Sequence, residues 1–172
     1  LDEVENRIED PSTALHGMCL EAVDYILGRE DLLDQLCIPE AHRDYIADSW
    51  RRRDPSLYGR FDLVYDGEGP AKLLEYNADT PTMLPESSVI QEAFNDHHSE
   101  PFQLNLLKRH LEVAFNRLLI ITKDQHPSLL ATSLGYKEDI ANAKLVMQIA
   151  AEEGFEVAYA DLPEIDFAKD EG

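Results

Sequence analysis

The spacing of apolar residues changes twice along this chain, and each change restricts the fold that it can adopt. Over residues 12–27 apolar side chains recur every three or four positions, which predicts an amphipathic helix, and a second helical pattern follows Pro39. Between 60 and 77 the spacing falls to two, as it does in β-strands. From residue 128 the pattern reads strand, helix, strand. The sequence therefore predicts an α/β protein with a helical N-terminal segment, an antiparallel β-hairpin and a βαβ unit.

Local signals mark both ends of the first helix. Ser12 or Thr13 could cap its N-terminus, because their hydroxyls can accept a hydrogen bond from the first turn. Gly28 suits its C-terminal end, where a residue without a side chain is favoured.

We divide the chain into consecutive segments that we expect to belong to one domain of a longer protein. These are a helical segment (1–57), a hairpin and loop carrying the candidate site (58–85), a pair of helices (86–127) and a βαβ unit (128–172). The first residue is Leu1 and the chain stops on a turn-like Asp-Glu-Gly, so we expect the last unit to be truncated.

Composition restricts the partners. Hydrophobic residues make up 44% and charged residues 29%, as in ordinary globular domains, and no apolar run approaches the roughly 20 residues of a membrane span. Without a signal-peptide pattern we expect a cytoplasmic protein. The net charge of −20 repels nucleic acid, but it does not exclude ATP, because Mg²⁺ and local basic groups can offset it. Such a surface could also attract a cationic substrate such as a polyamine.

The hairpin over 60–77 carries the most informative polar residues. If the turn residues 67–70 form its loop, Asp62 lies directly opposite Glu75 and Arg60 opposite Asn77. Because side chains alternate along a strand, these residues share one face. The other face then carries an apolar set: Phe61, Leu63, Tyr65, Leu74 and Tyr76.

Two opposed carboxylates need a reason to be there. At ~5 Å and an effective dielectric of ~20 they repel by about 3 kcal/mol. A divalent cation between Asp62 and Glu75 would remove this repulsion, and Asn77 adds a third oxygen ligand of the kind that suits Mg²⁺. The planar guanidinium of Arg60 suits a phosphate beside the metal. Two alternatives stay open: Arg60 pairs with both acids in an ordinary ion network, or a shorter loop places Asp62 and Glu75 on opposite faces.

Two stretches of the sequence carry a family resemblance. Residues 58–62 (Tyr-Gly-Arg-Phe-Asp) and 74–82 (Leu-Glu-Tyr-Asn-Ala-Asp-Thr-Pro-Thr) resemble the glutathionylspermidine synthase family of ATP-grasp carboxylate–amine ligases. The likeness extends to 18–23, 49–50 and 54–57 and covers most of the chain loosely, but only 58–82 is specific.

The resemblance implies a role for each residue of the site. Arg60 matches the catalytic arginine that contacts the transferred phosphoryl group of ATP. Asp62, Glu75 and Asn77 match the ligands of the Mg²⁺ ions that bridge the ATP phosphates. Thr80 and Thr82 fall where other members carry serines that contact the peptide substrate.

The implied reaction is the phosphorylation of a peptide carboxylate to an acyl phosphate, followed by attack of an amine or polyamine to form an amide. An ATP-grasp ligase also needs later lobes that clamp the nucleotide, so we expect this chain alone to be inactive. The alternative from another class is a non-catalytic module that binds a peptide or a polyamine.

Overall fold

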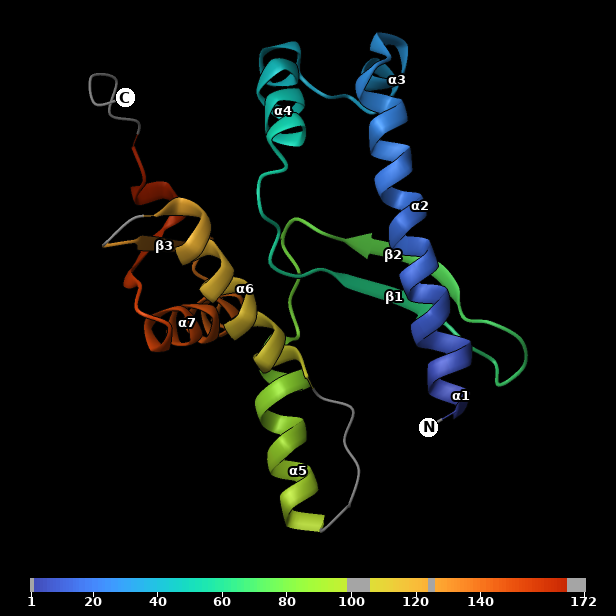
Figure 1. The fold of residues 1–172 in the computed structure, drawn as a ribbon, viewed down its shortest axis with the longest axis vertical. Coiled ribbons are helices and arrows are strands. Elements are labelled where there is room, and N and C mark those ends of the chain that lie inside the picture. Colours follow the sequence, from blue (N-terminus) through green and yellow to red (C-terminus); the bar gives the residue numbers. More distant parts are fainter. Residues whose placement is uncertain (1, 99–105, 124–125, 167–172) are drawn as a thin grey trace. The chain divides into compact units, whose positions relative to one another are not determined.

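The computed structural model describes residues 2–98, 106–123 and 126–166 (Figure 1). The chain forms two compact units, Leu1–Asp79 and Thr80–Gly172. A helical N-terminus, an antiparallel hairpin and a parallel strand pair are all present. The predicted α/β fold class is therefore confirmed.

Helices fill the first part of the first unit. The chain passes from α1 (Asp2–Val4) through a π-helical turn, η1 (Glu5–Glu9), into α2 (Asp10–Leu27), and Gly28 follows as its C-cap. The predicted cap at Ser12 or Thr13 is wrong, because the helix begins earlier, and the Ser12 hydroxyl donates to the carbonyl of Ile8 one turn back (2.6 Å).

Two shorter helices follow, α3 (Glu30–Gln35) and α4 (Glu40–Arg52). Arg43 of α4 joins them, since its guanidinium donates to Glu30 (2.5 Å) and Asp34 (2.6 Å) and also to the carbonyl of Ile38 (2.9 Å). The Arg43 guanidinium therefore satisfies a backbone carbonyl in the turn between the two helices and holds α4 to α3 through two ion pairs.

The hairpin packs against the N-terminal helix. Its strands are β1 (Arg60–Val64) and β2 (Lys72–Asn77). The amide of Ala71, a buried residue, donates to the carbonyl of Arg7 (2.7 Å), and the Tyr65 hydroxyl donates to Glu3 (2.6 Å). Contacts between residues about 60 positions apart thus hold the turn end of the hairpin on the start of the helix.

The second unit is built on the predicted βαβ element. Strands β3 (Ser128–Ser133) and β4 (Glu156–Asp161) pair in parallel and are connected through α7 (Lys137–Glu152). Its other elements are η2 (Glu86–Ile90), α5 (Gln91–His98), α6 (Leu107–Thr122) and the 3₁₀ turn η3 (Leu162–Glu164). Within the predicted pair of helices (86–127), residues 99–105 and 124–125 lie outside the described residues.

The core of the second unit lies where α6 and α7 meet the parallel strands. Its buried apolar side chains are Leu84, Leu111, Phe115, Ile149 and Ala150. Phe115 also contacts Phe155 edge to face, with ring centroids 5.3 Å apart. One buried polar residue, Asn142, is satisfied, because its amide accepts from the Leu84 N–H and donates to the Glu138 carbonyl (both 2.9 Å).

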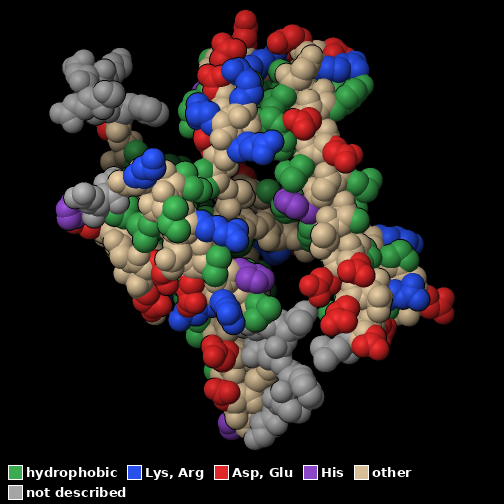
Figure 2. All heavy atoms as spheres, in the orientation of Figure 1, with side chains coloured by type: hydrophobic (Ala, Val, Ile, Leu, Met, Phe, Trp, Pro, Cys, Tyr) green, Lys and Arg blue, Asp and Glu red, His purple; other side chains and the backbone are tan. Residues whose placement is uncertain are grey.

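The surface matches the composition. Asp and Glu side chains are exposed over both units (Figure 2). Among the described helices none is long and apolar enough to cross a membrane.

Phe115 tests the core of the second unit. Replacing it by alanine leaves a cavity in a fully buried position, so Phe115→Ala is expected to lower the free energy of unfolding by about 3–5 kcal/mol. Ile120→Ala on the same helix removes a side chain that is 75% exposed and should change it by less than about 0.5 kcal/mol. Urea denaturation followed by circular dichroism measures both, and equal effects would contradict this assignment of the core.

Candidate functional site

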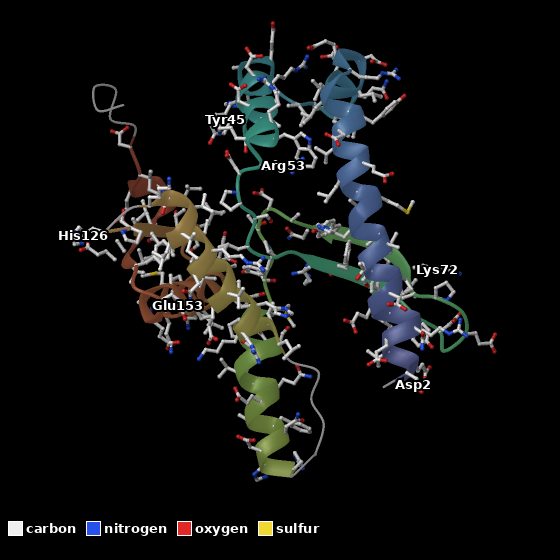
Figure 3. All side chains as sticks on the ribbon, in the orientation of Figure 1. Asp2, Tyr45, Arg53, Lys72, His126 and Glu153 are labelled. Carbon is white, nitrogen blue, oxygen red and sulfur yellow. The ribbon has the colours of Figure 1, made fainter. Side chains whose placement is uncertain are left out.

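The strand pairing brings the predicted site residues together at the open end of the hairpin. Arg60 pairs with Asn77 and Asp62 with Glu75, as the four-residue loop predicts. Directly opposed residues of an antiparallel pair point to the same face. The alternative in which Asp62 and Glu75 lie on opposite faces is therefore wrong. In Figure 3 Lys72 marks the turn end of β2, and the site lies toward the other end of that strand.

The predicted register fails on the turn side of the site. A β-bulge follows the Asp62–Glu75 pair, so that Leu63 pairs with Leu73 and the extra residue, Leu74, has no pairing partner in β1. Leu74 was expected on the apolar face, but its side chain is 70% exposed, so this prediction is wrong. Leu73 takes the place opposite Leu63 instead.

An ion pair connects two of the candidate residues along β1. The Arg60 Nε lies 2.8 Å from Asp62 Oδ1, and its Nη2 lies 3.5 Å from Oδ2. Both side chains are only partly exposed, 30% and 42% respectively, and Glu75 on the neighbouring strand is exposed. The Arg60–Asp62 part of the ion-network alternative is therefore present. It orients the guanidinium on the face that Glu75 shares.

The donor set suits a metal that substrate also ligates. Among the described residues no group of three or more His, Cys, Asp and Glu side chains could hold an ion. The hairpin instead offers two carboxylates and the amide of Asn77, whose Oδ1 accepts the Asp79 N–H (3.2 Å). Mg²⁺ is usually bound through one or two carboxylates, with waters and phosphate oxygens completing its octahedron. These residues fit a magnesium ion shared with a phosphate and do not fit a closed, all-protein cage.

An aromatic pair on the reverse face holds this arrangement. Phe61 lies between Arg60 and Asp62 on β1, and Tyr76 lies between Glu75 and Asn77 on β2, so both rings point to the reverse face. The two rings pack together with their centroids 4.1 Å apart. The Tyr76 hydroxyl shares a hydrogen bond with Nδ1 of His16 on α2 (3.0 Å). Burial raises the pKa of the Tyr76 phenol, so the ring stays neutral near pH 7.

A glycine allows the aromatic pair to sit where it does. A Cβ at Gly59 would come 2.6 Å from the Tyr76 ring and 3.2 Å from the Asn77 carbonyl. The ring cannot give way without disturbing Phe61 and the bond to His16. The close approach of the Tyr76 ring therefore requires a glycine at position 59.

The remaining candidates lie in the second unit. Thr80 is exposed and Thr82 half-buried, both in the loop that precedes η2. Their role at the peptide substrate stays a prediction.

Glu86 was not among the candidate residues that the sequence indicated. Its Oε2 is buried and has no hydrogen-bond partner among the described residues. The sequence carries no signal for this, because an acid after a proline at a helix start is an ordinary N-terminal pattern.

Comparison with known proteins extends over the whole chain. A family model described as "Glutathionylspermidine synthase preATP-grasp" matches residues 1–172. A putative acid–amine ligase of Haemophilus influenzae is 44% identical over 86 residues, which are 50% of this chain and 21% of that protein. A bifunctional glutathionylspermidine synthetase/amidase of Escherichia coli is 34% identical over 92 residues (53% and 15%), and a trypanothione synthetase of Crithidia fasciculata is 33% identical over 81 (46% and 12%). The aligned parts thus cover 12% to 21% of these relatives.

Gly59 and Gly17 form a matched pair for testing the aromatic anchor. Gly59→Ala is expected to displace the Tyr76 ring and to lower the thermal midpoint of unfolding, with loss of the His16 contact. Gly17→Ala meets nothing within 4 Å in the interior of α2, so it should stabilise the chain by about 0.5–1 kcal/mol. Thermal unfolding followed by circular dichroism measures the stability of both variants, and NMR of the His16 ring reports its contact with Tyr76. If both variants were stabilised, the close approach at Gly59 would be contradicted.

Proposed function

Because the chain belongs to the glutathionylspermidine synthase family, as its pre-ATP-grasp part, we propose that it is the N-terminal portion of an ATP- and Mg²⁺-dependent ligase that joins a peptide carboxylate to an amine or polyamine. One observation carries the proposal. Asp62 lies directly opposite Glu75, with Arg60 and Asn77 paired beside them at the end of the hairpin.

In this function the hairpin binds the phosphates of ATP. Asp62, Glu75 and Asn77 would hold Mg²⁺, which when bound neutralises charge on the phosphate oxygens. The Arg60 guanidinium donates to the phosphoryl group in transfer, where negative charge must be stabilised. Its ion pair with Asp62 orients the guanidinium before substrate arrives, so less ordering is left to the reaction.

The reaction proceeds in two balanced steps. A carboxylate oxygen of the peptide attacks the γ-phosphorus of ATP, and the bond to the ADP oxygen breaks, which leaves an acyl phosphate and ADP. The amine nitrogen then attacks the acyl carbon, phosphate leaves, and the nitrogen loses a proton as the amide forms. Thr80 and Thr82 supply hydroxyl donors that orient the peptide near its reacting carboxylate. Catalysis of this kind depends on positioning and electrostatic stabilisation.

The relatives support the reaction class. Their names describe an acid–amine ligase, a glutathionylspermidine synthetase and a trypanothione synthetase. The net charge of −20 also agrees with an amine substrate that is cationic at neutral pH.

Removing either carboxylate tests the metal role. Asp62→Asn and Glu75→Gln keep the shape of each side chain but remove its charge, so each is expected to weaken Mn²⁺ binding to this chain, measured by electron paramagnetic resonance, by about tenfold or more. In a ligase that contains this segment, both variants should abolish amide formation. Glu68→Gln in the exposed turn of the same hairpin is the control and should leave both measurements unchanged. Retained ligation in Asp62→Asn and Glu75→Gln would remove the metal role.

The isolated chain should not turn over ATP. The matching family model describes a pre-ATP-grasp part, and we expect the clamp for the nucleotide in the ATP-grasp lobes that this model does not describe. We expect no release of phosphate from ATP and Mg²⁺ by these 172 residues, measured with a coupled phosphate assay. Hydrolysis that disappears in Asp62→Asn would contradict this expectation.

A further inference from the structure

A cleft of about 1050 Å³ lies within the first unit, between α2, α4 and the open end of the hairpin. Aromatic and aliphatic side chains make most of its wall, among them Leu20, Val23, Trp50, Leu57, Tyr58 and Tyr76. This volume is at the upper end of the range for small-molecule pockets.

The cleft is separate from the proposed magnesium site. Gly59 and Tyr76 line it, and Tyr76 belongs to the hairpin face opposite to Asp62 and Glu75. A molecule in the cleft would therefore contact the reverse side of the strands and not the carboxylates.

The charges on the cleft wall leave one cation available. In the basic run at the end of α4, Arg51 pairs with Asp48 (2.7 Å) and Arg52 with Asp54 (2.7 Å). Arg53, which lines the cleft, has no side-chain hydrogen bond or ion pair among the described residues. The Arg53 guanidinium is therefore the cation of the cleft wall that can accept a new partner.

The two acidic residues of the wall are already engaged. Asp54 accepts from Arg52 in a two-point contact (3.1 and 2.7 Å). Asp24 accepts the indole N–H of Trp50. Arg53 is thus the charge with free donors, which favours an anionic ligand over a cationic one.

The backbone at Arg53 is left-handed, as it also is at Lys123, the C-cap of α6. Arg53 caps α4 with φ of 57°, a left-handed conformation in which helices usually carry glycine. An arginine there costs free energy that a glycine would not. Glycine is therefore a replacement that this backbone position tolerates.

We propose that this cleft binds a small organic anion with a flat apolar body, such as an aryl carboxylate. The carboxylate accepts both arms of the Arg53 guanidinium, and the body packs against Trp50 and Tyr58. Burial raises the pKa of Tyr58, so its phenol is neutral near pH 7 and does not repel the ligand.

Trp50, the chain's single tryptophan, reports binding directly. We use 3-phenylpropionate as the probe, phenethylamine as a cation with the same body, and inorganic phosphate as an anion without it. Titration of tryptophan fluorescence should saturate with 3-phenylpropionate and show affinity at least about tenfold higher than for the other two, as a charged hydrogen-bonded pair provides. Equal or tighter binding of phenethylamine or of phosphate would overturn the proposal, as would the absence of saturation.

Two variants of Arg53 assign the effect. Arg53→Gln should weaken 3-phenylpropionate binding about tenfold, whereas Arg51→Gln, which removes a cation paired outside the cleft, should change it less than about twofold. Arg53→Gly removes the guanidinium at a backbone angle that glycine adopts freely, so it should fold and also lose binding. Unchanged affinity in Arg53→Gly would overturn the proposal.

Discussion

The contact between Phe61 and Tyr76 is the interaction on which the candidate site depends. Each ring alternates along its strand with two of the polar residues, so packing the rings together fixes which acids face each other. The bond from Tyr76 to His16 then ties this register to a helix 60 residues earlier in the chain. The polar face is therefore determined by apolar packing behind it. The repulsion between Asp62 and Glu75 is thus opposed by the aromatic packing behind them and reduced by the ion pair between Asp62 and Arg60.

Part of this hairpin could be predicted from its turn residues and its alternation. Counting outward from a Gly67-Glu68-Gly69-Pro70 loop pairs Asp62 with Glu75, as observed, although the pairs next to the turn are shifted by one residue and the bulge restores the predicted register. The bulge could not be predicted, because Leu73 and Leu74 are identical residues and either could serve the apolar face. The extra residue is recognisable only when Phe61 and Tyr76 are already paired. Local alternation thus fails where two neighbouring side chains satisfy the same pattern.

The start of the first helix shows a second limit. Residues 2–9 carry few apolar side chains, so their helix has no periodic signal, and Ser12 resembled a cap. The contacts Tyr65–Glu3 and Ala71–Arg7 extend the helix toward the hairpin. Tertiary contacts therefore override local capping preference. The roles proposed for the site residues come from the family resemblance. The sequence alone did not decide whether Arg60 pairs with an acid of the hairpin, and the structure shows its ion pair with Asp62.

The two units differ in how much apolar surface they bury. Among the described residues of the first unit, Leu33 and Ala71 are the buried apolar ones, whereas the second has a cluster around Phe115. The first unit therefore opens locally at a lower free energy, and its amide hydrogens exchange sooner with solvent. Any ligand that binds only its closed form stabilises it, by about 2.7 kcal/mol at a concentration one hundred times the dissociation constant. Ligand occupancy and the folding of this unit are consequently linked, so a saturating ligand also protects its backbone from proteolysis.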